Sequence, residues 1–190
     1  MKLLFFTGSR SEWGYIRPIL QICKNKKIKY EICATNMHLL DSFGNSLKEI
    51  EKDGFKVKEK IYMALEGYNN FTMTKSLFIL GSSFTDLIYR SKPDWIILAG
   101  DRGESLVASI VAAYTNTPIA HIQAGELSGN IDGQARHAIG KFAHIHFASN
   151  PDAYKRLIKL GEEKFRIKLV GAPQLDDLKS NKRIFNNLTS

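Results

Sequence analysis

The chain has 190 residues, of which 44% are hydrophobic, and carries a formal net charge of +8. Its length and composition allow one sizeable core, which excludes a disordered chain. The lysines are scattered along the sequence instead of forming one basic stripe, so we expect no nucleic-acid partner, and an anionic small molecule fits the positive charge equally well.

The sequence also indicates the cellular compartment of the protein. Nowhere does an apolar run reach membrane-spanning length, and the N-terminal apolar run is too short for a signal peptide. Cys23 and Cys33 lie outside any zinc-ligand spacing and look like buried positions in a reducing compartment. We therefore expect a cytoplasmic protein with no membrane partner.

Short β-rich runs alternate with longer amphipathic segments along the chain. We expect strands at 2–8, 30–36, 57–63, 95–101, 118–125, 144–149 and 166–172. We expect helices at 13–25, 71–91, 103–114, 133–142 and 151–160, the last opened by an Asn150 N-cap followed by a proline. This alternation predicts an α/β fold, a parallel sheet with helices on both faces.

The first predicted strand is followed by a turn of small residues, Thr7 to Ser9, and then by Arg10. In an open parallel sheet, ligands collect beyond the carboxyl ends of the strands. Free backbone amides at the start of the next helix would attract a phosphate or a carboxylate beside Arg10. The turn lacks the glycine pattern of a dinucleotide-binding loop and the lysine of a P-loop, which excludes both assignments.

Two later strand ends also carry ionisable residues. The fourth strand ends at Asp101 and Arg102, which either serve a site or act as a helix cap and a solvated arginine. The fifth strand leads into a glycine-punctuated loop that contains Glu126, Ser128 and Asp132, the last of which could instead cap the next helix. We expect the turns after the first, fourth and fifth strands to converge on one edge of the sheet.

Four of the five histidines lie between residues 121 and 146. His144 and His146 are two apart on a predicted strand and would share one face, while His137 would lie on the preceding helix. Such a pair can bind a metal, but the spacing fixes no third ligand and neutral histidines are often satisfied in cores, so we expect neither metal nor cofactor. His38, after the second strand, would face the site or cap the following helix.

Four motifs, GSRSEWG, AGDRGES, HIQAGELSGNID and RHAIGKFAHIHFAS, occur in this order on the predicted strand ends. Together they resemble the hydrolysing UDP-N-acetylglucosamine 2-epimerases of sialic acid and related nonulosonate biosynthesis. The resemblance implies two Rossmann-like domains across a cleft, the GT-B arrangement, and a homo-oligomer at full length. We expect residues 1–178 to be the N-terminal domain and 179–190 a linker or truncated edge toward a missing C-terminal nucleotide-binding domain.

The family's reaction implies roles for the ionisable residues. A base removes the C2 proton of the sugar while UDP leaves C1, which gives a glycal, and water is then added to give free N-acetylmannosamine. A positioned carboxylate and cationic groups near the diphosphate would couple these events. By resemblance, Asp101, Glu126 and Asp132 match the essential acids, and which of these carboxylates removes the proton and which assists the addition of water stays open. The residues expected to bind the UDP-sugar are Ser9, Arg10, Arg102, Ser128, Arg136, His137 and His146.

The chain departs from this pattern at Gln123 and Ala124, which precede Gly125 and Glu126. Close relatives often carry an ionisable glutamate or histidine in place of Gln123, so the acetamido sugar and the nucleotide stay open. Two alternatives are a GT-B-type glycosyltransferase domain, against which the carboxylate-rich loop argues, and a non-catalytic nucleotide-sugar-binding module.

Overall fold

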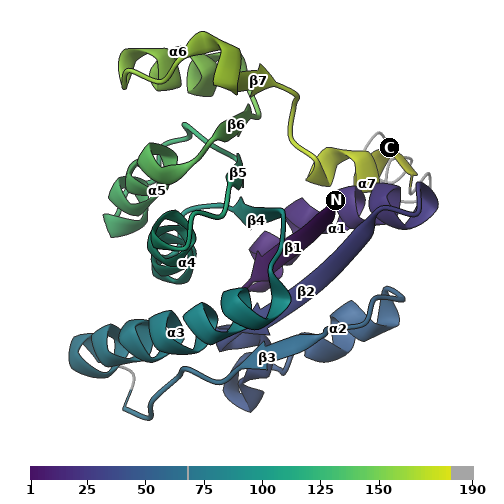
Figure 1. Cartoon of the computed structure of the whole chain (residues 1–190), viewed down its shortest axis with the longest axis vertical. Coiled ribbons are helices and arrows are strands. Elements are labelled where there is room, and N and C mark those ends of the chain that lie inside the picture. The colour runs from purple at the N-terminus through teal and green to yellow at the C-terminus, as the bar shows by residue number, and fades with distance from the viewer. Residues whose placement is uncertain (68, 181–190) are drawn as a thin grey trace, which may run out of the picture.

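The computed structural model describes residues 1–67 and 69–180 (Figure 1). Within them a seven-stranded sheet has the order β3-β2-β1-β4-β5-β6-β7, with every neighbouring pair parallel. The strands are β1 (Lys2–Thr7), β2 (Lys29–Thr35), β3 (Glu59–Ile61), β4 (Trp95–Ala99), β5 (Ile119–Ile122), β6 (Ile145–Ala148) and β7 (Ile167–Leu169). The seven predicted strands and their parallel arrangement are therefore confirmed, although every strand except β2 is shorter than its predicted run.

The five predicted helices are also present, and two short helices join them. The helices are α1 (Arg10–Asn25), α2 (Leu47–Lys52), α3 (Asn70–Ser91), α4 (Gly103–Tyr114), α5 (Ile131–Phe142), α6 (Pro151–Lys159) and α7 (Gln174–Ser180). Asn150 caps α6 as predicted, because its side chain accepts a hydrogen bond from the amide of Ala153 at 2.8 Å. Of the described helices, none is long and apolar enough to cross a membrane.

Helices pack on both faces of the sheet, as predicted. On one face, Trp13, Ile16 and Leu20 of α1 and Ile50 of α2 pack with Phe5. The opposite face carries α3, α4 and α5, whose buried side chains meet alternate residues of the same strands; the residues are Leu4, Phe6, Leu80, Phe84, Leu98, Ala108 and Ile139. Strands such as β1 are apolar on both sides because both of their faces are buried.

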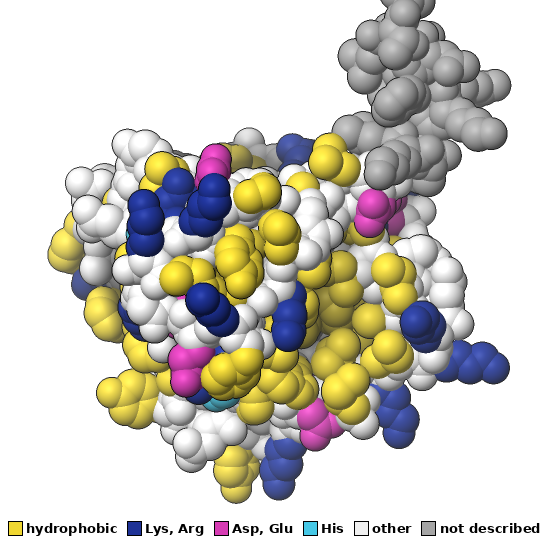
Figure 2. All heavy atoms as spheres, turned by 90° about the horizontal axis from the view of Figure 1, so that it is seen from above, with side chains coloured by type: hydrophobic (Ala, Val, Ile, Leu, Met, Phe, Trp, Pro, Cys, Tyr) yellow, Lys and Arg dark blue, Asp and Glu magenta, His cyan; other side chains and the backbone are white. Residues whose placement is uncertain are grey.

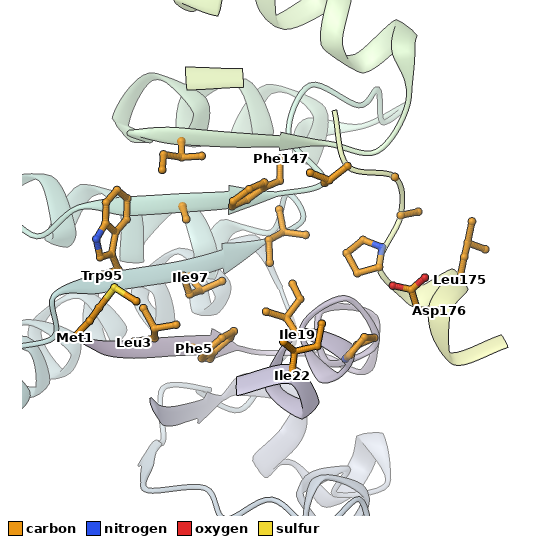
Figure 3. Close-up of a pocket in the computed structure, with 18 residues that line it drawn as sticks. Met1, Leu3, Phe5, Ile19, Ile22, Trp95, Ile97, Phe147, Leu175 and Asp176 are labelled. Carbon is orange, nitrogen blue, oxygen red and sulfur yellow. The ribbon is translucent and has the colours of Figure 1, made fainter. Parts of the chain in front are cut away.

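One part of the α1 face has no helix over it among the described residues. There, β1, β4, β5 and β6 form the floor of an apolar groove of about 600 Å³, bordered by α1 and by residues 170–176. Figure 3 shows Leu3, Trp95, Ile97 and Phe147 pointing into this space from the strands. In Figure 2, which looks onto the α6 end of the molecule, hydrophobic side chains gather around a hollow right of the centre.

The loop after β5 is fixed to α6 at a single glycine. Gly125 has a left-handed φ of 78°. A Cβ atom at this position would lie 2.5 Å from the carbonyl oxygen of Ala153 and 2.7 Å from Cγ of Leu157. Since real Cβ atoms do not approach backbone so closely, only glycine fits, and the loop that carries Glu126 is held directly against α6.

We predict that Gly125→Ala lowers the free energy of unfolding by roughly 2–4 kcal/mol, because it adds a steric clash to an unfavourable φ. Urea denaturation of the parent and the variant measures this difference. Gly129→Ala is the matched control, since a Cβ there would meet no atom within 4 Å. Equal unfolding midpoints for the two alanine variants would contradict the packing described here.

Candidate functional site

Arg136 of α5 gathers the polar groups at the carboxyl edge of the sheet. Its side chain is only 8% exposed. One terminal nitrogen donates to Oδ2 of Asp101 and, at 3.2 Å, to the hydroxyl of Ser128. The other donates to the carbonyl oxygen of Gln123 at 2.7 Å and lies 3.8 Å from Oε2 of Glu126. The prediction that Asp101 and Glu126 lie at the same end of the sheet is therefore confirmed.

Asp101 is held as a carboxylate in this cluster. Burial opposes its ionisation, but hydrogen bonds from Ser128, at 2.5 Å, and from Arg136 outweigh that effect, so the pKa of Asp101 lies below its usual value. Asp101 does not cap α4, because the N-cap position belongs to Arg102 and no side chain caps the helix there. The helix-cap alternative for Asp101 is thus excluded.

Glu126 is held by neutral donors and stays accessible, with 31% of its side chain exposed. The hydroxyl of Ser149, at the end of β6, donates to Oε1 of Glu126. With its amide nitrogen turned toward the carboxylate, Gln123 donates to the two oxygens at 2.5 and 3.2 Å. Arg156 of α6 secures the backbone beside it by donating to the carbonyl oxygen of Gly125 at 2.5 Å. This carboxylate is therefore fixed in position but open to a ligand.

Gln123 has a conformation that its sequence did not predict. Its φ is 62°, a left-handed value that costs a residue with a side chain on the order of 1–3 kcal/mol. The turn directs its carbonyl oxygen to Arg136 and its side chain to Glu126. Strained backbone of this kind is common at functional sites, where the surrounding contacts maintain it.

Asp132 and His137 lie on the same helix as Arg136. Asn130 caps α5, because its side-chain oxygen accepts a hydrogen bond from the backbone amide of Asp132 at 3.0 Å. Asp132 is therefore an acid in the first turn of the helix and not its cap. His137 is half-buried, and burial followed by the charges of Arg156 and Arg136 lowers its pKa. His137 is therefore neutral near pH 7, with a buried Nδ1 that lacks a hydrogen-bond partner.

The turn after β1 is organised differently from our expectation. Ser9 caps α1, and the amides of Gly8 and Ser9 donate to Oε2 of Glu12 at 2.5 and 3.0 Å. The amides expected to be free thus bind a carboxylate of the chain itself. Arg10 is exposed, and a terminal nitrogen of its guanidinium lies 2.7 Å from Oε1 of Glu49 on α2. The structure therefore does not bring Arg10 into the Arg136 cluster.

Two acids that the sequence analysis did not single out are buried beside this turn. Burial and, next, the neighbouring charge of Glu104 raise the pKa of Glu12 to about 7. Glu104 lies 3.5 Å from Nε of Arg102, the predicted substrate-binding arginine. The spacing of Ser9 and Glu12 fits the S-x-x-E capping box, a signal that could have located Glu12.

The prediction that His144 and His146 share one face of a strand is wrong. β6 begins at Ile145, and His144 lies before it, exposed, with its ring edge-on to Trp95. His146 is fully buried, with Nε2 3.3 Å from Oε2 of Glu162 in the loop that leads into β7. The structure therefore places His146 inside the sheet, at the position of β6 that pairs with His121 of β5.

The two remaining histidines are internal links. His121 donates from Nε2 to the carbonyl oxygen of Gly100 at 2.7 Å, and burial lowers its pKa to about 4. His38 does not face the site, because it is buried between the hydroxyls of Thr7 and Ser46, at 2.9 and 2.7 Å. Burial lowers the pKa of His38 to about 4 as well. Both imidazole rings are therefore neutral near pH 7, and their hydrogen bonds hold residues at the ends of the strands.

The arrangement brings together groups suited to proton transfer beside an anionic ligand. An accessible carboxylate, Glu126, lies beside an ionised one, Asp101, and both lie within ion-pair distance of the guanidinium of Arg136. Within residues 1–67 and 69–180, no three His, Cys, Asp or Glu side chains come close enough together to hold a metal ion. General acid-base chemistry by carboxylates is what this edge supports best.

Comparisons with known proteins give a consistent result. A family model described as UDP-N-acetylglucosamine 2-epimerase matches residues 21–190. A hydrolysing UDP-N,N'-diacetylbacillosamine 2-epimerase from Legionella pneumophila is 36% identical over 190 residues, which cover 97% of this chain and 50% of that protein. The chain thus spans about half the length of that relative.

Solved structures share the fold. The UDP-GlcNAc 2-epimerase from Methanocaldococcus jannaschii has a TM-score of 0.84 at 21% identity, covering 97% of this chain and 49% of that one. The Neisseria meningitidis enzyme bound to UDP-GlcNAc has a TM-score of 0.81 at 22% identity, covering 98% and 52%. These matches confirm the predicted Rossmann-like half of a GT-B-type fold.

We predict that Asp101→Asn lowers the free energy of unfolding by about 2–4 kcal/mol, because it leaves Arg136 buried beside a neutral amide. Chemical denaturation at pH 7 measures the difference. Glu49→Gln, which breaks the exposed pair with Arg10, is the matched control and should change the stability far less. An equally small change for both variants would show that Asp101 is not the main counterion of Arg136.

A second prediction concerns pH. The pKa of Glu12 rises from 4.5 to about 7 on folding, so the stability that its proton contributes is complete below pH 4.5 and is lost as the pH rises toward 7. Glu12→Gln lacks this dependence. Relative to the parent, its free energy of unfolding should therefore rise between pH 5 and pH 8, by at most about 3 kcal/mol.

Urea denaturation of the two proteins at several pH values in this range gives the difference directly. Taking the difference removes the opposite contributions of the buried histidines, which both proteins share. Glu51→Gln, at an exposed position of α2, serves as the control for loss of one negative charge. A difference between Glu12→Gln and the parent that does not vary with pH would refute the raised pKa.

Proposed function

The chain belongs to the UDP-N-acetylglucosamine 2-epimerase family, and from this premise we propose that it is the catalytic N-terminal half of a hydrolysing 2-epimerase. The substrate would be UDP-N-acetylglucosamine or a related acetamido nucleotide sugar, and the products UDP and a free N-acetylmannosamine-type sugar. The observation that carries the proposal is the junction of Asp101, Glu126 and Arg136 at the carboxyl edge of the sheet.

The reaction needs a base and an acid on one sugar ring. Removal of the C2 proton supplies the electron pair of a C1–C2 double bond, while the C1–O bond breaks and UDP leaves with its electrons. Water then adds its hydroxyl at C1, and a proton returns to C2 from the other face of the ring. We propose that Glu126 and Asp132 perform these two proton transfers, and that ionised Asp101 orients the sugar.

The remaining predicted residues would bind and orient the substrate. Arg136 and Ser128 lie within the cluster and can donate to sugar oxygens once a ligand enters. Arg10, at the rim, would meet the diphosphate by exchanging its exposed partner Glu49 for the ligand. The proposed set of substrate-binding residues is completed by Ser9, Arg102, His137 and His146. Because His146 is buried within β6, it would contribute from inside the sheet.

The isolated chain is expected to bind UDP weakly and to turn over little. It spans about half the length of the relatives it matches, and the β1 turn offers no free amides to a diphosphate because Glu12 occupies them. Calorimetry that gave micromolar UDP affinity for residues 1–190 would contradict this expectation.

The longest natural form of the protein, incubated with UDP-N-acetylglucosamine in deuterated water, tests the activity. We expect UDP and free N-acetylmannosamine carrying deuterium at C2, detected by NMR. A glycosyltransferase would need an acceptor and would leave C2 unlabelled, and a binding module would leave the nucleotide sugar unchanged. Repeating the assay with diacetamido sugars linked to UDP or GDP identifies the substrate.

We predict that Glu126→Gln and Asp132→Asn each lower kcat by a factor on the order of 10² to 10⁴, because the amides keep the shape of the side chains but cannot exchange protons. UDP affinity should change much less, since these groups contribute mainly to the transition state. Asp152→Asn, a first-turn acid of α6 outside the cluster, is the matched control. Turnover within about threefold of the parent for both loop variants would remove these acids from the chemistry.

A further inference from the structure

Two buried acids lie beneath the strand ends and have no part in the proposed proton transfers. Glu12 of α1 is 1% exposed and Glu104 of α4 is 4% exposed. Carboxyl groups are costly to bury unless hydrogen bonds or opposite charges satisfy them. The partners of these acids therefore show which parts of the chain they hold together.

Glu12 first holds the turn after β1. Its Oε2 accepts hydrogen bonds from the amides of Gly8 and Ser9, and its Oε1 accepts one from the hydroxyl of Ser105 at 3.1 Å. Ser105 lies in the first turn of α4. A single side chain thus connects the start of α1 with the start of α4.

The same side chain also lies close to the turn after β4. A Cβ atom at Gly100 would lie 3.8 Å from Cγ of Glu12 and 3.7 Å from the ring of Tyr15, so this turn faces α1 with room for little more than a methyl group between them. The next residue is Asp101, the main counterion of Arg136. Glu12 thus lies between the β1 turn and the turn that leads to Asp101.

Glu104 extends this arrangement to a third strand end. Its Oε1 accepts a hydrogen bond from the side chain of Asn36, which follows β2 with a left-handed φ of 46°. The two acids border the same space, because a Cβ atom at Gly8 would lie 3.4 Å from Oε2 of Glu12 and 3.7 Å from Oε1 of Glu104. The turns after β1, β2 and β4 meet at this pair.

We propose that Glu12 is a positioning residue of the candidate site, which sets the location of the Asp101 turn relative to the Gly8–Arg10 turn without contacting the ligand. The proposal rests on the proposed function only in assuming that Asp101 acts on the substrate. The hydrogen bonds to the β1 turn and to Ser105 of α4, together with the close approach of Gly100, support it.

The surroundings make this link sensitive to protons. The ionisable groups that face Glu12 are Glu104 and Arg102, from α4 and the turn before it, and Tyr15, from α1 itself. Burial and then Glu104 raise the pKa of Glu12 to about 7. A proton on Oε1 can be donated to the oxygen of Ser105, so the hydrogen bonds persist while the charge disappears.

An NMR titration of the 190-residue chain tests the link without any substrate. Amide shifts are followed from about pH 5.5 to 8.5 in the parent, in Glu12→Gln and in the exposed-site control Glu51→Gln. We expect the amides of Gly8, Ser9, Gly100 and Asp101 to share a midpoint near pH 7 in the parent and the control. In Glu12→Gln all of these amides should lose that midpoint.

Two outcomes would overturn the proposal. If Gly8 and Ser9 titrate while Gly100 and Asp101 do not, Glu12 only caps α1. If the shared midpoint persists in Glu12→Gln, another group is responsible for it. Glutamine can accept from the two amides and donate to Ser105, so this variant preserves the fold in which the comparison is made.

Kinetics of the longest natural form provide an independent measurement. Glu12→Ala should lower kcat by roughly ten- to a hundredfold with little change in KM, because a displaced Asp101 affects the transition state more than binding. Glu12→Gln should restore kcat to within about threefold and remove any change of kcat near pH 7. If the parent shows no turnover, the proposed function fails, while the titration still decides the role of Glu12.

Discussion

A guanidinium cannot lose its proton at any physiological pH, so a buried arginine must be surrounded by acceptors. Arg136 imposes this requirement on the carboxyl edge of the sheet. Asp101 comes to it from the end of β4, the carbonyl oxygen of Gln123 from the end of β5, and Ser128 and Glu126 from the loop that follows. The contacts that satisfy the guanidinium of Arg136 thus hold the end of β4, the end of β5 and the loop after β5. The same contacts maintain the left-handed backbone of Gln123.

The neighbouring pair of acids, Glu12 and Glu104, is stabilised in a different way. Around Arg136, unlike charges offset the cost of burial, and ionisation of Asp101 is favoured at neutral pH. Around Glu12, the neighbouring acid Glu104 carries the same charge, and hydrogen bonds from the amides of Gly8 and Ser9 help to hold the carboxyl group. The edge of the sheet therefore combines the Arg136 cluster, in which Asp101 is ionised, with a second acid, Glu12, whose charge changes near pH 7; the short turn at residues 100–102 separates the two.

Much of this could be predicted from the sequence. Alternating strands and helices predict the parallel sheet, and the strand-end rule brings Asp101 and Glu126 together before any coordinates are known. The pairing of Arg10 with Glu49 could not be predicted, because six-residue α2 is too short to show a helical period. The prediction that His144 and His146 share one face was wrong for a related reason. The face on which a side chain lies can be predicted only for residues within the strand, and β6 begins one residue after His144.

The segment from the end of β5 to the first turn of α5 has, near each end, a glycine at which a Cβ atom would meet backbone. Gly125 lies against Ala153, and a Cβ atom at Gly133 would lie 2.6 Å from the carbonyl oxygen of Ser128. Between these two glycines, Leu127 and Ile131 are 68% and 71% exposed. Evolution can therefore alter the side chains that the loop presents to solvent while the path of its backbone, and with it the placement of Glu126, stays constant. Under the proposed function, such a loop would suit diversification among sugars that share one reaction.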